Sequence, residues 1–501
     1  MTTLTSGTPP LRKATDPEVV VHPLAVPDRV LLLLSAATVV DDGLLTALLQ
    51  IALDEQRRDV VWLALALLRP ELPSMVDVNR SWRQLRLDGP AAVLTAEDDR
   101  RGLMVSTAEQ PPLHERLVHN QVLVDVHHTA HYAHRTGIQR VVLETLRRWA
   151  VTQPIRVVGW TEDFAALRDL DQAEHQHVDA GPGPERPSWA LVPWQCTFLL
   201  PEVVVDLPRL TRLSAMVESG AVRLSALVYD LIPVTAAETA GPAMPGAFAA
   251  YLGVLRHATT ITPISTAAAT EYRGFGMMLA GQGLTGPEVV EVPLPAEAVA
   301  TDPAGVLAAR ATLGLGDIPM VLAVGTHEPR KNHLALLHAA ELLWREGLDF
   351  RLVLLGNNGW GSTEFIARSV ALQAAGRPLS LVHRASDDLL WASYHAARVV
   401  AFPSIHEGFG LPVAEALTCG TPVVTSNVGS MLQLAVEGGA LAVDPHDDHA
   451  LADALRSVLT DDDLHARLCA EALARTVRSW DVYAAEVWQA LTRPAVVDLR
   501  S

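Results

Sequence analysis

The chain has 501 residues, of which 49% are apolar and 19% are charged, and its formal net charge is −18. This length exceeds what one hydrophobic core can fill, so we expect two or three domains with large buried sheets. The acidic balance argues against a general binder of nucleic acid or of another polyanion.

Cysteine usage and apolar runs indicate the compartment. Cys196, Cys419 and Cys469 are widely spaced and form no CxxC pair, so neither a disulfide framework nor a zinc site is expected, and the cytoplasm is the simpler location. The N-terminus lacks the basic-then-apolar order of a secretory signal. The longest apolar runs, such as 30–40, are shorter than the roughly 20 residues that cross a bilayer. We expect a soluble protein, or at most a peripheral one.

The first part of the chain carries no chemical motif. Residues 1–27 are rich in Thr, Pro and charge, which predicts a poorly ordered start. Over residues 28–115, apolar residues repeat at helical spacing, which predicts a mainly helical extension of unknown role. Such an extension packs either on the rest of the chain or on a partner.

Short buried strands begin after Gln121, and helical stretches lie between several of them. This pattern predicts a Rossmann-like domain over residues 120–300. Its expected strands are 122–126, 155–159, 198–205, 224–229 and 260–263. The segment 288–319, rich in Pro, Ala and Gly, is expected to connect two domains.

From residue 318 to 475, strands alternate more regularly with helices of 10 to 15 residues. This alternation predicts right-handed βαβ units in a second doubly wound parallel sheet. Its expected strands are 320–326, 350–356, 379–384, 398–404, 422–426 and 440–445. Two such sheets leave a cleft between them, and open α/β sheets bind ligands beyond the carboxyl ends of their strands. An amphipathic helix follows within residues 476–501, and we expect it to dock on one or both domains.

The stretch 399–420 places two carboxylates, Glu407 and Glu415, around a glycine-flanked turn from a strand into a helix. Gly408 and Gly410 allow the backbone to turn and to approach a ligand, and Pro412 suits the first position of a helix. The start of that helix is a seat for phosphate, and carboxylates accept strongly from sugar or ribose hydroxyls. The pattern predicts a nucleotide-sugar pocket. An ordinary strand-turn-helix with solvated acids is the alternative.

A second motif, GTHEPRKNH (325–333), directly follows a strand. Arg330 and Lys331 precede a helix expected to begin near Asn332, and two cations there oppose the helix dipole. A bound anion would remove the conflict, because Arg can hold phosphate through two N–H groups and Lys adds a point charge. A solvated basic turn is the alternative.

Three weaker signals come from the earlier sheet. Gly137, with Arg140 alongside, lies just before a helix, where it either approaches a diphosphate or serves a plain helix cap. Asp230 follows a strand, where it either binds an acceptor hydroxyl or caps a turn. Four histidines fall in one expected loop that has no accompanying carboxylate set, so polar lining is favoured over a metal site; they are His127, His128, His131 and His134.

Taken together, HEPRKN, HEGFGLPVAE, CGTPVVTSNVGS and VDP resemble the retaining glycosyltransferases of family 4. The resemblance is dense over residues 320–445 and looser over 121–294, and it leaves out residues 1–115. It implies an α/β GT-B fold, in which two doubly wound Rossmann-like domains face a cleft. The domain 120–300 would bind the acceptor and the domain 318–475 the nucleotide-sugar donor. The helix in 476–501 would cross back onto the N-terminal domain.

The resemblance also implies roles for single residues. Arg330 and Lys331 would hold the donor diphosphate, Glu415 the ribose hydroxyls, and Glu407 the transferred sugar; Arg330, Lys331 and Glu407 form the expected catalytic set. The full expected donor-binding set is Gly137, Gly325, Arg330, Lys331, Gly408, Phe409, Gly410, Leu411 and Glu415. The acceptor-side candidates are Tyr229, Asp230 and Arg140.

Two departures from the family pattern bear on activity. Tyr229 stands where many relatives carry a histidine that contacts the donor sugar, so either its hydroxyl replaces that contact or catalysis is reduced. Leu432 and Gln433 replace the usual Pro-Glu pair, which leaves sugar and acceptor selection open.

The expected reaction moves a hexosyl group from a nucleoside diphosphate sugar to a hydroxyl of a glycan, lipid-linked or small-molecule acceptor, with retention and without a cofactor or metal. A lipid-linked acceptor would add peripheral contact with a membrane. The alternative is a non-catalytic nucleotide-sugar or glycan binding protein. A dinucleotide-dependent oxidoreductase is disfavoured, because no GxGxxG follows a strand with an acidic residue about 20 positions later.

Overall fold

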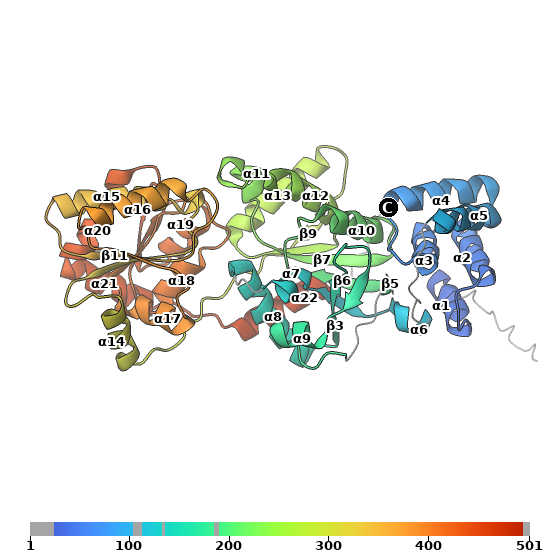
Figure 1. Ribbon diagram of the computed structural model, residues 1–501, viewed down its shortest axis with the longest axis horizontal. Helices are drawn as coiled ribbons and strands as arrows, with labels where there is room; N and C mark the ends of the chain where they lie inside the picture. Colours follow the sequence, from blue (N-terminus) through green and yellow to red (C-terminus); the bar gives the residue numbers. More distant parts are fainter. Residues whose placement is uncertain (1–24, 104–112, 133–135, 185–189, 494–501) are drawn as a thin grey trace, which may run out of the picture.

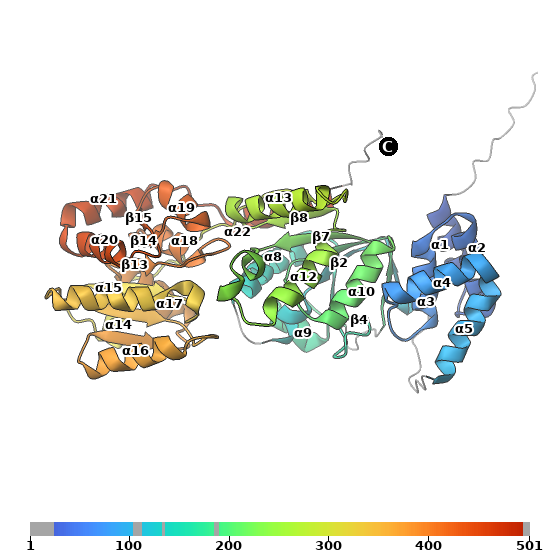
Figure 2. The same ribbon diagram turned by 90° about the horizontal axis from the view of Figure 1, so that it is seen from above.

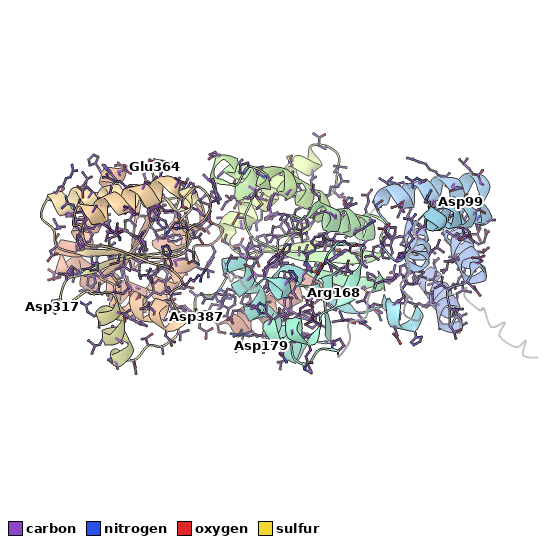
Figure 3. The ribbon with its side chains drawn as sticks, viewed as in Figure 1. Asp99, Arg168, Asp179, Asp317, Glu364 and Asp387 are labelled. Carbon is purple, nitrogen blue, oxygen red and sulfur yellow. The ribbon has the colours of Figure 1, made fainter. Side chains whose placement is uncertain are left out.

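The computed structural model describes residues 25–103, 113–132, 136–184 and 190–493. A C-terminal domain, an N-terminal domain and a helical extension lie in a row (Figures 1 and 2). Figure 3 labels Asp99 on the extension, Arg168 and Asp179 on the N-terminal domain, and Asp317, Glu364 and Asp387 on the C-terminal domain. Of the segment predicted to be poorly ordered, residues 1–24 lie outside the described residues, and a helix begins at Val26.

The helical extension consists of α1 (Val26–Ala36), α2 (Asp42–Asp54), α3 (Arg58–Leu68), α4 (Met75–Asp88) and α5 (Pro90–Leu103). Asp41 begins α2 by accepting from the Leu44 N–H at 2.8 Å, and Ser74 and Asp77 form a capping box at α4. Helix α3 is buried on every side, with Val60 through Leu67 at most 3% exposed. Its core continues into that of the N-terminal domain, so the extension packs on the rest of the chain.

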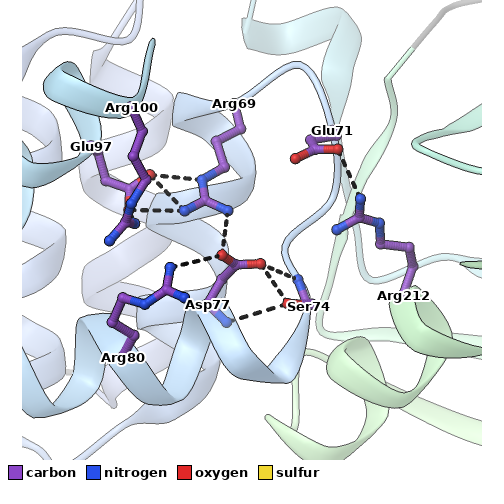
Figure 4. Close-up of polar contacts among 8 residues, drawn as sticks. All are labelled: Arg69, Glu71, Ser74, Asp77, Arg80, Glu97, Arg100 and Arg212. Atoms are coloured by element: carbon purple, nitrogen blue, oxygen red, sulfur yellow. Dashed lines mark hydrogen bonds and ion pairs between the residues drawn. The ribbon is translucent and has the colours of Figure 1, made fainter. Parts of the chain in front are cut away.

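Ion pairs tie the corner between α3 and α4 to its surroundings (Figure 4). Arg69 contacts Glu97 of α5 at 2.7 Å and Asp77 of α4 at 3.1 Å. Glu71 contacts Arg212 of the N-terminal domain at 2.8 Å. The Arg69 pairs hold the helices of the extension together, and the Glu71–Arg212 pair joins the extension to the end of the N-terminal domain that lies away from the C-terminal domain (Figure 1).

The N-terminal domain is built on a seven-stranded sheet in the order β4-β3-β2-β6-β7-β8-β9, parallel except for β4 against β3. Its strands are β2 (Val122–Asp125), β3 (Ile155–Trp160), β4 (Leu167–Asp169), β6 (Cys196–Leu200), β7 (Val222–Val228), β8 (Thr260–Pro263) and β9 (Glu288–Val289), and β1 (Leu117–His119) pairs separately with β5 (Val192–Trp194). Its helices are α6 (Leu113–Arg116), α7 (His127–His131), α8 (Gly137–Thr152), α9 (Gln172–His177), α10 (Leu207–Glu218), α11 (Ile232–Thr235), η1 (Ala237–Thr239), α12 (Met244–Leu255) and α13 (Thr266–Ala280).

The C-terminal domain has a fully parallel six-stranded sheet in the order β12-β11-β10-β13-β14-β15. Its strands are β10 (Met320–Val324), β11 (Arg351–Leu355), β12 (Leu379–Val382), β13 (Val399–Phe402), β14 (Val423–Ser426) and β15 (Ala440–Val443). Its helices are α14 (Pro303–Thr312), η2 (Pro329–Lys331), α15 (His333–Arg345), α16 (Thr363–Ala374), α17 (Asp387–Ala396), α18 (Leu411–Thr418), α19 (Gly429–Val436), α20 (Asp448–Thr460) and α21 (Asp462–Leu473). The predicted α/β class with two doubly wound sheets and a helical extension is confirmed.

Two segments connect the domains. The expected connection 288–319 contains β9 and helix α14, and α14 packs against α17 of the C-terminal domain. Helix α22 (Trp480–Thr492) returns to the N-terminal domain and packs on α8, β7 and β8. The Trp149 indole N–H donates to the Ala484 carbonyl at 2.9 Å, which fixes this returning helix.

The strand order reverses at one point in each sheet, and ligands of open α/β sheets bind at such points. In the N-terminal sheet the reversal lies between β2 and β6, and a buried ion cluster closes the carboxyl ends of these two strands. Arg209, fully buried, lies 2.9 Å from both Asp125 and Glu202. In the C-terminal sheet it lies between β10 and β13, whose following loops carry the two main sequence motifs.

The Arg209→Met variant is expected to lose about 3–5 kcal/mol of stability, because two buried carboxylates then lose their only described cation. Differential scanning calorimetry would show the loss as a lower unfolding temperature. The matched control is Arg345→Ala on α15, whose side chain is 68% exposed and whose loss is expected to change stability by less than about 0.5 kcal/mol. Equal stability of the two variants would contradict a structural role for the cluster.

Candidate active site

The loop after β10 is shaped by glycine and by tight packing. Gly325 has φ +138°, and its carbonyl oxygen would lie 1.9 Å from a Cβ placed on Gly356 after β11. Only residues without a side chain fit where these two loops meet. The chain then forms the short helix η2, passes Asn332 in the left-handed region, and begins α15 at His333, one residue after the expected start.

Arg330 and Lys331 converge on Glu407 from the neighbouring turn. Lys331 Nζ lies 2.7 Å from Glu407 Oε1, and Arg330 Nη1 lies 2.6 Å from Oε2. Burial alone would raise the pKa of Glu407, but the two cations lower it to about 2. Burial lowers the pKa of Lys331 despite the attraction of Glu407. The two cations therefore have a counter-ion within the protein, Glu407, which the sequence analysis assigned only to sugar hydroxyls.

The turn after β13 has the glycines that its shape requires. Gly410 has φ +91° and precedes α18, and Pro412 occupies the second rather than the first helical position. A Cβ on Gly408 would lie 2.7 Å from Asp230 Oδ2 of the N-terminal domain. The Ser430 hydroxyl, on α19, donates to the Glu407 carbonyl at 2.9 Å. The turn is therefore fixed from both sides, and Phe409 and Leu411 are part of it.

Glu415 lies one turn into α18 and is only 4% exposed. Its carboxylate accepts from the Tyr394 hydroxyl at 2.7 Å and pairs with Arg140 of α8. The Arg140 guanidinium also lies 5.7 Å from the ring centre of Trp391. The Arg140–Glu415 pair therefore joins the two domains.

Gly137 begins α8, and Thr136 and Gln139 form a capping box there. A Cβ on Gly137 would lie 3.6 Å from Leu411 Cδ1. The starts of α8 and α18 thus face each other across the domain interface.

The two acceptor-side candidates after β7 point in different directions. Tyr229 is 5% exposed, and its hydroxyl donates to the Pro201 carbonyl at 2.9 Å within the N-terminal domain. Asp230 faces the Gly408 turn, and its Oδ1 accepts from the Ile232 N–H at 3.2 Å. Burial raises the pKa of Asp230 to about 6 against the opposing field of Arg330.

Sequence reasoning missed the contacts of α13 with the turn after β13. The Ser265 hydroxyl, which caps α13, donates to the Gly408 carbonyl at 2.6 Å. Glu271 Oε1 lies 2.8 Å from His406 Nε2. His406 stands inside the recognised motif, and Ser265 ends the segment PIS, which also resembles the family; Glu271 carries no local signal, because its partners lie far along the chain.

Two of the histidines 127–134 have structural partners. His127 Nδ1 accepts from the Trp160 N–H at 3.2 Å, and His128 Nε2 lies 2.7 Å from Asp206. Part of this expected loop is helix α7, and His134 lies outside the described residues. Within the part of the chain that the structure describes, no group of three or more His, Cys, Asp or Glu residues is arranged to hold a metal ion. None of the helices described there is both long and apolar enough to span a membrane.

The arrangement is that of a GT-B protein: two facing Rossmann-like domains, with the two main sequence motifs at the carboxyl ends of strands. Residues 309–475 match the family described as glycosyl transferases group 1, so the chain carries a domain of that family. The chain is 27% identical over 365 residues to the serotype-specific mannosyltransferase WbdA of Escherichia coli, which covers 68% of this chain and 43% of that protein. It spans less than half the length of the first curated relatives that it matches.

Solved structures show the same fold. Sucrose-phosphate synthase from Thermosynechococcus elongatus superposes with a TM-score of 0.55 at 20% identity, over 74% of this chain and 98% of that chain. Anabaena HepE, solved with UDP and glucose, superposes with a TM-score of 0.55 at 14% identity, over 74% of this chain and 99% of that chain. At these identities the likeness concerns the fold alone.

Proposed function

We propose that this chain transfers a hexosyl group from a nucleoside diphosphate sugar to a hydroxyl acceptor, with retention of anomeric configuration. The observation that carries the proposal is the Arg330–Lys331–Glu407 cluster at the strand-order reversal of the C-terminal sheet. In the structure the Glu407 carboxylate lies between the two cations. A donor diphosphate would take over that position, and Glu407 would turn toward the transferred sugar.

The remaining donor contacts follow from the elements around this cluster. The Glu415 carboxylate would accept from the ribose hydroxyls once Arg140 moves aside, and Tyr394 would hold it in place. Gly137 and Leu411 bring two helix starts together, and their N–H groups suit a diphosphate. A side chain at position 325 would contact Lys331, and one at position 408 would contact Asp230. The glycines at these two positions leave room for the ligand.

The proposed chemistry is front-face displacement. As the bond to the diphosphate breaks, negative charge develops on the leaving oxygen, and Arg330 and Lys331 would stabilise it in a preorganised, largely buried site. The leaving diphosphate would help to take the acceptor proton. Since two fixed side-chain cations supply the positive charge, we propose that no divalent ion and no cofactor is needed.

A panel of UDP-, GDP- and ADP-hexoses tests the proposal. GDP-mannose with a mannosylated glycan is the first pair to try, because the E. coli relative is named as a mannosyltransferase. We expect transfer that survives EDTA, with retained configuration in the NMR spectrum of the product. Inversion would refute the retaining mechanism, and loss of activity in EDTA would refute metal independence.

A second candidate is a nucleotide-sugar binding protein without turnover. One observation favours it: the Tyr229 hydroxyl is engaged with the Pro201 carbonyl and is not presented to a donor sugar. Calorimetric binding of a nucleoside diphosphate sugar without transfer or hydrolysis would support this candidate over the enzyme.

A further inference from the structure

One carboxylate, that of Glu271 on α13, links two loops from opposite domains. Its Oε2 accepts from the Leu231 N–H at 2.8 Å, and its Oε1 lies 2.8 Å from His406 Nε2. The Glu271 and His406 side chains are 16% and 28% exposed. The bridge is therefore largely shielded from water, where such charge-assisted hydrogen bonds are strong.

The two bridged residues are the chain neighbours of the groups that matter most in the proposed reaction. Leu231 directly follows Asp230, the carboxylate on the acceptor side. His406 directly precedes Glu407, and its carbonyl accepts from Arg330 Nη1 at 3.1 Å. Helix α13 makes a second contact with this turn through Ser265 and the Gly408 carbonyl at 2.6 Å. One helix thus contacts both reacting sides.

We propose that Glu271 is a positioning residue, which sets the acceptor-side Asp230 loop against the donor-side Glu407 turn when the two domains are closed. This inference rests on the proposed function and extends it to the control of domain closure. Nothing in the recognised motifs requires a carboxylate at this position. Its effect on the reaction would be geometric, because misplacement of reacting groups by about 1 Å can cost roughly 10²-fold in rate.

The strength of the bridge between Glu271 and His406 depends on pH, because His406 must be protonated to carry its charge. The hydrogen bond that the His406 ring donates to the Glu271 carboxylate raises the pKa of His406 against the effect of burial, and the fields of Asp230 and Glu407 also raise this pKa. Three acids therefore act on the His406 ring: Glu271, Asp230 and Glu407. The cation Arg330 contacts the backbone carbonyl of His406. The charged bridge is fully present below the ordinary pKa of histidine. It is lost as pH rises through the raised pKa.

Steady-state kinetics of Glu271→Ala test the positioning role. We expect kcat to fall about 10- to 100-fold, with the Kd for the nucleoside diphosphate changed less than about threefold, since Glu271 contacts no expected donor-binding residue. Glu271→Gln should fall between, because an amide oxygen can accept from only one of the two partners at full strength. The matched control is Glu291→Gln, which weakens contacts with Thr266 and Arg273 on the same helix, involves neither Leu231 nor His406, and should leave kcat unchanged. An equal loss of kcat in Glu271→Ala and Glu291→Gln would overturn the proposal.

A readout independent of activity separates this inference from the proposed function. In protein with ¹³C-labelled histidine, the His406 resonance, assigned by its loss in His406→Gln, should titrate above the ordinary pKa and shift down in Glu271→Gln. His406→Arg should keep the bridge charged and remove the alkaline fall in kcat. The same His406 pKa in Glu271→Gln as in the wild type would contradict the proposed bridge. A lower His406 pKa in Glu271→Gln, in a protein that neither binds a nucleotide nor transfers a sugar, would contradict only the proposed function.

Discussion

Lys331→Ala is expected to lower kcat/KM for the donor by about 10²–10³-fold, the usual cost of losing one preorganised charge stabiliser. Lys331 Nζ lies 2.7 Å from Glu407 and 4.7 Å from the ring centre of Phe402, in a position that a diphosphate would share. The fold should survive, because Arg330 remains as a partner for the Glu407 carboxylate. The loss should appear both in nucleotide affinity, by calorimetry, and in the transfer rate.

Two further variants sharpen this test. Arg345→Ala removes an exposed cation from α15, away from the cluster, and should leave the kinetics of transfer unchanged. Glu407→Gln removes the protein's own anion from between the cations, so it should tighten the binding of a free nucleoside diphosphate while transfer declines. Wild-type turnover in Lys331→Ala, or weaker diphosphate binding in Glu407→Gln, would contradict an anion site at these cations.

The regular part of the fold could be predicted from the sequence. In the C-terminal domain each expected strand overlaps an observed one, as 320–326 does with β10 (Met320–Val324), because buried parallel strands are continuous apolar runs between clear turn signals. Helices α14, α19 and α21 were not predicted in that domain. Helix α14 lies in the stretch expected to be a connection, and α19 is short, with a Gly429 start that resembles a loop. Arg330 and Glu407 meet because the strands that they follow, β10 and β13, are neighbours in the sheet, an order that the sequence did not predict.

The ionic partners could not be predicted. Arg140 and Glu415 come from different domains, and neither residue carries a sign of the other in its local sequence. The orientation of the Tyr229 side chain could have been predicted from the sequence. Successive side chains of an extended segment point to opposite faces, so if Asp230 faces the interface, Tyr229 faces the core. The family resemblance drew attention to the position instead of to this alternation.

The second large effect is expected at Asp230, whose replacement by Asn should lower the rate of transfer about 10²–10⁴-fold. Its Oδ2 lies against the Gly408 turn, and no ion pair to it is found among the described residues, whereas Glu407, Glu415 and Glu271 all have one. A carboxylate in that position can accept from an acceptor hydroxyl and hold it beside the donor sugar. Nucleotide affinity should stay close to that of the wild type.

The raised pKa of Asp230 predicts a pH dependence of the rate and a gain in stability for Asp230→Asn, neither of which would result from a loss of structure. Burial raises the pKa from 3.8 to about 6, so the wild-type rate should fall as pH decreases through about 6, and Asp230→Asn should lack this fall. The same raised pKa means that ionised Asp230 destabilises the fold, by an amount that grows as pH rises from the unfolded value to the folded one. Asp230→Asn should therefore be more stable at pH 7 by about 1–3 kcal/mol. A variant that is slower but less stable would indicate a structural role, and a covalent sugar adduct on Asp230 in mass spectrometry would replace front-face displacement with a double displacement.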